Sequence, residues 1–264
     1  MVCEKHEMAE FKLDPTSLKD GIFILSEINN EFEKIYLKVR EKENRIFSDA
    51  ELKQLPFASE LNPHKKEWDL RAKSFQRFKE YLKSKKQNFD ILDLRCGNGW
   101  FSGQLSKSFN HNFHCVDVNL TELKQGRNIF NSEQIKFIYA DIFKADIPSA
   151  FFDIIIINAA VQYFPDIKRL MEKLLTLINE NGEIHIVDSP FYSETEVDNA
   201  RKRTVDYYHS IGFPEMMKNY FHHSFSELSE FNNEVLYNPY SFNKKVMRLF
   251  LIKDSPFPWI KITG

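Results

Sequence analysis

Three aspartates, Asp93, Asp117 and Asp141, follow one another at intervals of 24 residues, and each ends a short apolar run. An interval of that length holds one strand and one helix, so a doubly wound sheet would bring all three carboxylates to one edge. An ionised carboxylate accepts two hydrogen bonds, which suits Asp117 to the two hydroxyls of a ribose. Asp141 could then accept from an exocyclic amine such as that of adenine. The spacing predicts a site for a nucleoside-like ligand.

A glycine turn follows the first of these aspartates in the sequence ILDLRCGNGW, residues 91–100. The chain has only 8 glycines, and it places Gly97 and Gly99 here, where backbone must bend or approach a ligand closely. A dinucleotide site would instead need a GxGxxG turn, and it would set Asp93 against phosphate charge. A ligand with an amino-acid group in place of phosphates fits better. Arg95 occupies a position where such turns usually carry glycine.

Five short apolar runs predict the strands that would position these residues, and helical segments separate most of them. The runs are 89–94, 112–118, 135–140, 152–158 and 183–188. Strands that alternate with helices in this way indicate a mainly parallel sheet covered on both faces. The ligand then belongs at the carboxyl ends of the strands.

A helical segment is expected before this region, over about residues 15–86. In it Ile24, Ile28, Phe32, Ile35 and Val39 would share one face of a helix. A short helix capped by Ser48 or Asp49 would stop before Pro56, and Asn62 and Pro63 would be the N-cap and first residue of a longer helix. We therefore expect a helical cap over residues 1–86 and the main domain over 87–264.

The chain after residue 189 is rich in aromatic residues and histidines, and we expect it to elaborate the substrate side. The expected elements are helices at 195–212 and 223–231, a strand at 234–239, a basic helix at 243–250 and a proline-rich end. No repeat or linker interrupts this part, so it is assigned to the main domain.

The segments DLRCGNG, VDVNLTEL, IYADIF and FDIIIINAAVQYF resemble, in this order, the motifs of class I S-adenosylmethionine-dependent methyltransferases, over about residues 89–190. The resemblance implies a Rossmann-like, mainly parallel seven-stranded sheet and S-adenosyl-L-methionine as cofactor. It implies Asp93, Gly97 and Gly99 at the methionine end of the cofactor. It also implies Asp117 and Val118 at the ribose and adenine, Asp141 and Ile142 at the adenine rim, and Asn158 with Ala159 near the sulfonium.

Residues beyond these motifs are candidates for two further tasks. Arg71, on the helix that carries Trp68, could bind the cofactor carboxylate bidentately, or both residues could serve packing and surface charge alone. A general base, where the acceptor needs one, would follow strands four and five, where the family places substrate contacts. The candidates for it are His209, His222, His223, Tyr163 and Asp188.

Composition limits the partners. The 36 basic and 38 acidic residues nearly balance, which gives no sign of a nucleic-acid or membrane-surface binder. Three widely spaced cysteines argue against a disulfide framework or a zinc site, and the first residues lack the apolar core of a signal peptide. We expect a cytoplasmic protein with no metal site and no membrane span.

The expected activity is in-line methyl transfer to a small molecule or a sugar or lipid precursor. The sequence Asn158-Ala-Ala-Val lacks the Asn-Pro-Pro-Tyr/Phe pattern of enzymes that methylate nucleobase or amide nitrogen, which disfavours those acceptors. Arg95 would be repelled by the sulfonium and attracted by the methionine carboxylate, so it is a further candidate for cofactor binding. It also leaves open a relative that binds the cofactor without turnover. An NAD-dependent oxidoreductase is disfavoured by the aspartate and glycine spacing.

Overall fold

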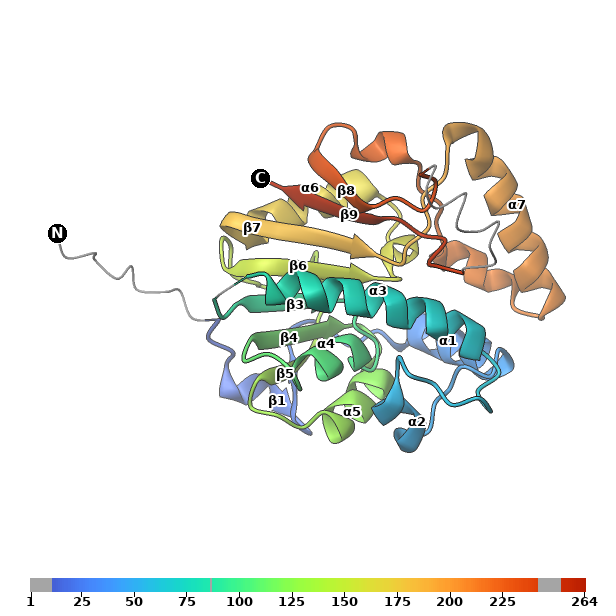
Figure 1. Ribbon diagram of the computed structural model, residues 1–264. Helices are drawn as coiled ribbons and strands as arrows, with labels where there is room; N and C mark the ends of the chain where they lie inside the picture. The colour runs from blue at the N-terminus through green and yellow to red at the C-terminus, as the bar shows by residue number, and fades with distance from the viewer. Residues whose placement is uncertain (1–10, 86, 242–252) are drawn as a thin grey trace.

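A nine-stranded sheet forms the centre of the described part of the chain, with the order β1-β2-β5-β4-β3-β6-β7-β9-β8 (Figure 1). The structure is a computed structural model that describes residues 11–85, 87–241 and 253–264. The strands are β1 Leu18–Lys19, β2 Ile22–Ile24, β3 Asp90–Leu94, β4 Asn112–Asp117, β5 Ile135–Tyr139, β6 Phe152–Asn158, β7 Ile178–Val187, β8 Asn232–Tyr237 and β9 Trp259–Thr263.

The mainly parallel α/β sheet is confirmed. The run from β2 through β5, β4, β3 and β6 to β7 is parallel, while β9 pairs antiparallel with β7 and β8. The seven strands from β5 to β8 form the expected sheet, and the hairpin β1–β2 extends it by two. The α-helices are α1 Asn30–Lys42, α2 Asp49–Gln54, α3 Lys65–Lys83, α4 Trp100–Leu105, α5 Leu120–Ile129, α6 Ile167–Leu177 and α7 Glu194–Ser210.

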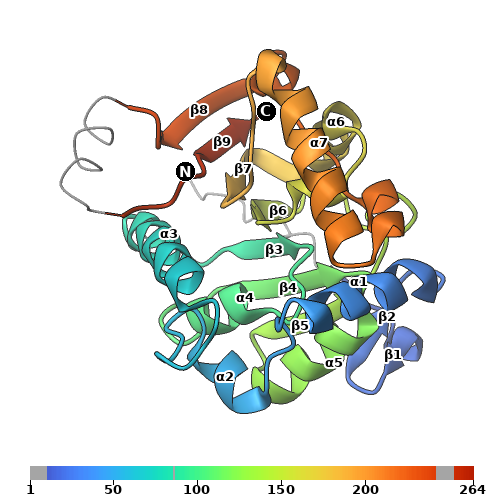
Figure 2. The same ribbon diagram turned by 90° about the vertical axis from the view of Figure 1, so that its right-hand side faces the viewer.

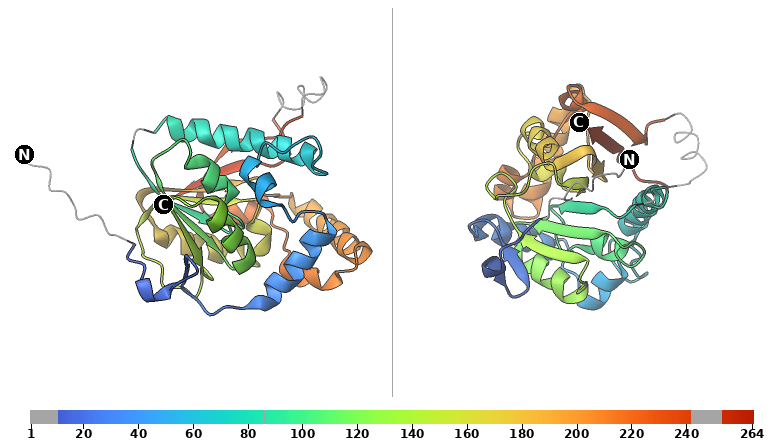
Figure 3. Two further views of the ribbon diagram at one scale, coloured as in Figure 1. Left: turned by 90° about the horizontal axis from the view of Figure 1, so that it is seen from below. Right: turned by 90° about the vertical axis from the view of Figure 1, so that its left-hand side faces the viewer.

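Two hydrophobic clusters cover the two faces of the sheet, because successive side chains of a strand point to opposite sides. In β3, Ile91 packs in the cluster that contains α3, α4 and α5 residues, whereas Leu92 packs in the cluster that contains α6 residues. Figure 3 shows the same arrangement, with α3 and α6 on opposite sides of the sheet. Helices α3, α4, α5 and α6 thus cover the faces of the sheet rather than the carboxyl edge of its strands.

The prediction that a helix already includes Ile24 is wrong. Residues 18–24 form the hairpin β1–β2, and Asp20 and Gly21 at its turn have φ values of 51° and 78°. An Asp-Gly pair favours two-residue hairpin turns, which need positive φ at both positions. Strand β2 then pairs with β5, so the first part of the chain shares the central sheet. The helix itself begins at Asn30.

The other helix boundaries in the described residues agree with those expected from the sequence, with local exceptions. Ser48 caps α2 through a capping box, as expected, and the helix ends before Pro56. The long helix α3 begins at Lys65, two residues later than expected, because Asn62 accepts a hydrogen bond from the His64 N–H instead of capping the first turn. In the last part, the expected helix at 223–231 is only a 3-10 turn, Phe225–Leu228.

The proline-rich end holds a strand that the sequence analysis did not predict: β9 fills the place between β7 and β8. Strand β8 was expected. The expected basic helix at 243–250 lies outside the described residues. The boundary between the parts 1–86 and 87–264 stays a prediction.

Helices α1 and α7 lie past the carboxyl ends of the parallel strands, at the right of Figure 1 and toward the viewer in Figure 2. They meet in a small hydrophobic cluster that joins Val39 of α1, Tyr208 of α7 and Met216. Segments from the beginning and the end of the chain therefore pack together over the sheet edge where a ligand is expected. None of the helices in the described part is both long and apolar enough to cross a membrane.

Candidate functional site

A cavity of about 370 Å³ opens at the carboxyl edge of the sheet, beneath α1 and α7. The ends of β3, β4 and β6 contribute one side, with Gly97, Asp117, Asn158 and Ala159, which we call the strand rim. Helices α1 and α7 and the turns after β6 and α7 contribute another, with Tyr36, Tyr163, Tyr208 and Tyr220, the tyrosine rim. The α3 residues Trp68 and Arg71 also line the cavity.

The glycine turn holds its shape through left-handed backbone. Gly97 and Gly99 have φ values of 58° and 67°, which glycine adopts without steric cost. A Cβ at Gly99 would lie 2.8 Å from the Phe137 ring, whereas a Cβ at Gly97 would lie 3.2 Å from the Glu122 carboxylate. Gly99 is thus required for packing beneath the turn, and Gly97 keeps the turn close to the cavity.

Asp117, at the end of β4, is the carboxylate around which the strand rim is organised. Its Oδ2 accepts from the Gly97 N–H at 2.8 Å, and its Oδ1 accepts from the N–H groups of Val118 and Asn119 at 2.7 and 2.9 Å. These three donors fix its orientation, and the residue still lines the cavity. A carboxylate held in a fixed orientation suits a diol.

Arg95 does not block the turn. Its backbone has a φ of 58° and donates to the Val116 carbonyl at 2.8 Å. Its guanidinium carbon lies 5.4 Å from the ring centroids of both Phe32 and Phe164, within cation–π range. The side chain therefore lies between two aromatic rings at the cavity wall.

The neighbouring strands β3, β6 and β7 are each followed by a non-glycine residue in left-handed backbone: Arg95, Ala159 and Asp188, with φ of 58°, 54° and 50°. Such residues cost about 1–2 kcal/mol each, and in native proteins they cluster at binding sites. The repeated strain marks this sheet edge as a site where geometry was retained at the expense of stability.

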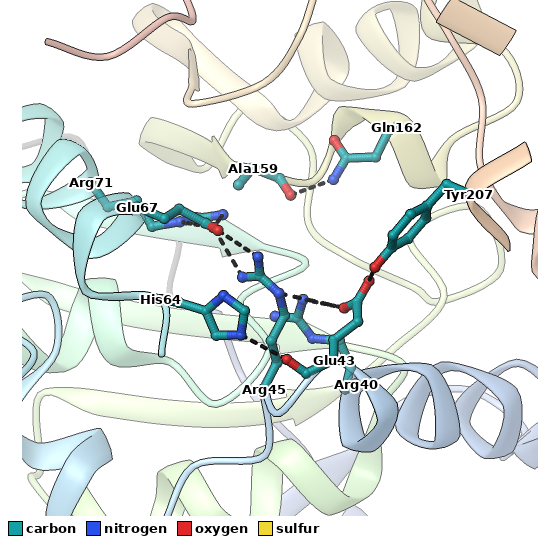
Figure 4. Close-up of polar contacts among 9 residues, drawn as sticks. All are labelled: Arg40, Glu43, Arg45, His64, Glu67, Arg71, Ala159, Gln162 and Tyr207. Atoms are coloured by element: carbon teal, nitrogen blue, oxygen red, sulfur yellow. Dashed lines mark hydrogen bonds and ion pairs between the residues drawn. The ribbon is translucent and has the colours of Figure 1, made fainter. Parts of the chain in front are cut away.

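Three arginines and two glutamates form a connected network on the cavity wall (Figure 4). Glu67 accepts from Arg45 and Arg71 at 3.0 Å each. Glu43 lies 3.6 Å from Arg40 and 3.5 Å from Arg45. Burial alone would raise the pKa of Glu67, yet Arg45 and Arg71 lower it to about 2, so the carboxyl stays ionised. With three arginines and two glutamates, the network has a formal net charge of +1.

Four buried polar atoms without hydrogen-bond partners belong to residues that line this cavity. They are Arg40 Nε, Trp68 Nε1, Asn158 Oδ1 and Gln162 Oε1. Only three further such atoms occur in the part of the chain that the structure describes. Buried polar groups in native proteins are nearly always paired, so their concentration here indicates groups that await a ligand.

Several residues implied by the motifs lie outside the cavity lining. Asp93 is buried behind the turn, where its Oδ2 accepts from Ser102 Oγ at 2.7 Å, and burial raises its pKa to about 6. Asp141 pairs with Lys144 at 3.2 Å. Gly99, Val118 and Ile142 are absent from the lining as well. Near Val118, the α1 residue Glu33 accepts from the N–H groups of Leu120 and Thr121.

Of the five candidate bases, the cavity lining includes only Tyr163. Burial raises the pKa of its phenol, so it stays protonated and can orient an acceptor rather than take its proton. His209 is exposed on α7. His222 contacts Thr204 Oγ1 at 2.8 Å, and His223 contacts the Phe164 carbonyl at 2.9 Å.

Asp188, the fifth candidate, accepts from Ser74 and Ser255 at 2.7 and 2.9 Å, and so connects β7 to α3 and to the segment before β9. Burial raises the pKa of this carboxyl. Its contacts are those of a residue that holds elements together.

The sequence analysis missed the residues that come from α1 and α7, above all Tyr36, Arg40, Glu43 and Tyr208. The run REKENR, residues 40–45, looks like a solvated helix face, and no spacing rule distinguishes it. Within the described ranges, no group of three or more His, Cys, Asp or Glu side chains is placed to hold a metal ion.

Known proteins resemble this chain over its central part. Residues 85–239 match the family model of a methyltransferase domain. An uncharacterized methyltransferase of Mycobacterium tuberculosis is 28% identical over 97 residues, which cover 37% of this chain and 49% of the relative. Malonyl-[acyl-carrier protein] O-methyltransferase 1 of Ilyobacter polytropus is 27% identical over 106 residues, 39% of each chain. The match thus spans half or less of these curated relatives.

A solved structure shares the fold. Phosphoethanolamine N-methyltransferase 2 of Haemonchus contortus, in complex with S-adenosyl-L-methionine, superimposes with a TM-score of 0.54 at 14% identity, over 88% of this chain and 59% of that chain. The sheet, with its helices on both faces, is therefore a Rossmann-like methyltransferase fold. Because the family model covers more than half of the sequence, the chain belongs to the methyltransferase-domain family.

Proposed function

We propose that this methyltransferase uses S-adenosyl-L-methionine and methylates a small molecule in the cavity between the strand rim and the tyrosine rim. The observation that carries the proposal is the convergence of Gly97, Asp117 and Asn158, from three neighbouring strand ends, on one cavity with unpaired buried polar atoms. Family membership and the solved relative that holds S-adenosyl-L-methionine support it.

The residues present fit this cofactor group by group. Asp117 offers an oriented carboxylate to the ribose hydroxyls. The indole N–H of Trp68, buried and unpaired, and the guanidinium of Arg71, 5.4 Å from the same ring, offer donors to a carboxylate such as that of methionine. When bound, the cofactor supplies an electrophilic methyl group.

The chain's own contribution is then positioning. Asn158 and Ala159 close the strand rim next to the tyrosine rim, so an acceptor held by the tyrosines would lie beside the cofactor. Tyr163, whose raised pKa keeps it protonated, can donate a hydrogen bond to the acceptor. In-line transfer needs little more where the acceptor is already a nucleophile.

Calorimetric titration with S-adenosylhomocysteine tests the proposal, followed by methyl transfer to a panel of metabolites. Binding and turnover are expected. An absence of binding at millimolar ligand would contradict cofactor use. Binding without turnover on any panel member would instead support the second reading, a relative that binds the cofactor without catalysis.

A further inference from the structure

The tyrosine rim differs from an ordinary hydrophobic wall because a charged side chain, Arg40, lies against one of its rings. Rings of Tyr36 and Tyr163 lie 5.8 Å apart, and Tyr220 lies 6.1 Å from Tyr163 and 6.0 Å from Tyr208. These four phenols come from α1, the turn after β6, α7 and the segment after it. The guanidinium carbon of Arg40 lies 5.5 Å from the Tyr36 ring centroid.

Arg40 retains one buried donor that no described group accepts. Its Nε is buried and has no hydrogen-bond partner, and its contact with Glu43 is 3.6 Å long. Glu43 is already engaged by the Tyr207 hydroxyl at 2.6 Å and by Arg45. An unpaired guanidinium N–H inside a protein is costly, because burial removes the water that would otherwise accept from it.

The charges that line the cavity also favour an anionic ligand. The lining holds five arginines, Arg40, Arg45, Arg71, Arg95 and Arg203, against the four acids Glu43, Glu67, Asp117 and Glu122. Of these acids, Asp117 accepts from the Gly97 N–H at the strand rim, Glu122 of α5 accepts from Asn119, and Glu67 is shared by Arg45 and Arg71. Two acids then act on Arg40: Glu43, at 3.6 Å and shared with Arg45, and Glu122, whose pKa burial raises to about 7 although Arg40 opposes the shift. Arg203 adds a second cation from α7.

We propose that the methyl acceptor carries an oxyanion, a carboxylate or a phosphate, which Arg40 binds while the tyrosine rim packs around the rest of the molecule. A guanidinium suits either anion, because its N–H groups are placed to donate two parallel hydrogen bonds to an oxyanion. The phenol hydroxyls provide further donors to the same group. This inference rests on the proposed function and specifies the acceptor of that site.

Matched pairs of probes test it on the intact protein saturated with S-adenosylhomocysteine. Benzoate against benzamide examines a carboxylate, and phenyl phosphate against phenol examines a phosphate. By calorimetry, at least one anion should bind about tenfold or more tighter than its neutral partner, as expected for a hydrogen bond to a charged group. The pair that shows the preference identifies the kind of anion.

The variants are Arg40→Gln, which removes the charge, and Arg40→Lys, which keeps it. Arg40→Gln should remove the anion preference, and Arg40→Lys should retain part of it. The control Arg201→Gln alters an exposed α7 arginine that pairs with Asp198 at 2.9 Å, and should change nothing. Both Arg40 variants should bind S-adenosylhomocysteine within about threefold of the unaltered protein, which also reports an intact fold.

Three results would overturn this inference and leave the proposed function standing. They are equal affinity for an anion and its neutral partner, no binding of either anion, and an anion preference that persists in Arg40→Gln. A loss of S-adenosylhomocysteine binding in Arg40→Gln would also overturn it, since Arg40 would then serve the cofactor. No S-adenosylhomocysteine binding by the unaltered protein would instead remove the proposed function, and the inference with it.

Discussion

At the strand rim, Gly97, Asp117 and Asn158 lie where neighbouring parallel strands stop, so the sheet itself sets their positions. At the tyrosine rim, Tyr36 and Tyr208 come from helices near opposite ends of the chain, and their positions depend on how α1 packs against α7. The first rim is held by backbone hydrogen bonds and glycine turns. The second is held by side-chain packing and by a few hydrogen bonds between its segments, such as that from Tyr207 to Glu43. We infer that the strand rim sets the general chemistry and that the tyrosine rim sets the choice of acceptor.

The largest effect is expected at the strand rim, from Asp117→Asn. The variant keeps the side-chain size but removes the charge, which would weaken both ribose hydrogen bonds. S-Adenosylhomocysteine affinity should fall about 100-fold, because a hydrogen bond to a charged group contributes about 1.5–3 kcal/mol. Calorimetry measures it, with Asp198→Asn, an exposed α7 residue, as the control. An unchanged affinity would show that the strand rim does not hold the ribose.

The two glycines of the turn should differ in their effect on stability. Gly99→Ala places a Cβ 2.8 Å from Phe137, in a packed core, and should cost about 2–4 kcal/mol from overpacking and left-handed backbone together. Gly97→Ala meets the carboxylate of Glu122 at 3.2 Å, which can move, so only the backbone cost of about 1–2 kcal/mol remains. Thermal denaturation of the two variants compares them directly, and equal losses would contradict this explanation.

The pH dependence of stability should report a buried acid beside the strand rim. Burial raises the pKa of Glu122 to about 7, with further contributions from Asp117 and Glu33, while Arg40 opposes the shift. The folded state then holds a proton that the unfolded state, with a pKa near 4.5, has released, so stability falls as pH rises from about 4.5 to 7.

Glu122→Gln should therefore raise the melting temperature at pH 8 and flatten its decline between pH 5 and 7. The amide can still accept the Asn119 hydrogen bond, seen here at 3.1 Å, so the helix cap is retained. Part of the slope should remain, because burial also raises the pKa of Asp93, to about 6. A variant with the full original slope would show that Glu122 is ionised throughout.

The smallest effect is expected from Arg95→Gly. Glycine relieves left-handed backbone that costs about 1–2 kcal/mol, while the loss of the contacts with Phe32 and Phe164 costs about 0.5–1 kcal/mol each. These terms nearly cancel in the free energy of unfolding, so the turn should keep its shape. Because the guanidinium contacts Phe32 and Phe164, S-adenosylhomocysteine affinity should stay within about threefold or improve. A large loss of affinity would make Arg95 a ligand of the cofactor carboxylate.

The contrast between the strand rim and the tyrosine rim also explains which site residues could be predicted from the sequence. Asp117 and the glycine turn were predictable because each follows a recognisable apolar strand, and parallel strands bring their carboxyl ends together whatever the helices do. Tyr36 and Arg40 were not, because their role depends on the angle at which α1 crosses the sheet edge, and periodicity carries no information on that angle.

Two other features show where local signals were overlooked or overridden. The Asp20-Gly21 pair is a hairpin signal inside a stretch that looked helical, and it decided the structure of residues 18–24. Strand β9 lies in a proline-rich segment, yet Trp259 to Thr263 pairs on both sides, because its prolines precede the strand.

The most direct test of the account is a crystal structure of the protein with S-adenosylhomocysteine. We predict that both ribose hydroxyls lie within hydrogen-bond distance of the Asp117 carboxylate, and that the sulfur faces Asn158 with the tyrosine rim beyond it. A ribose bound away from Asp117, or a sulfur turned away from the tyrosine rim, would contradict the assignment of one rim to the cofactor and the other to the acceptor.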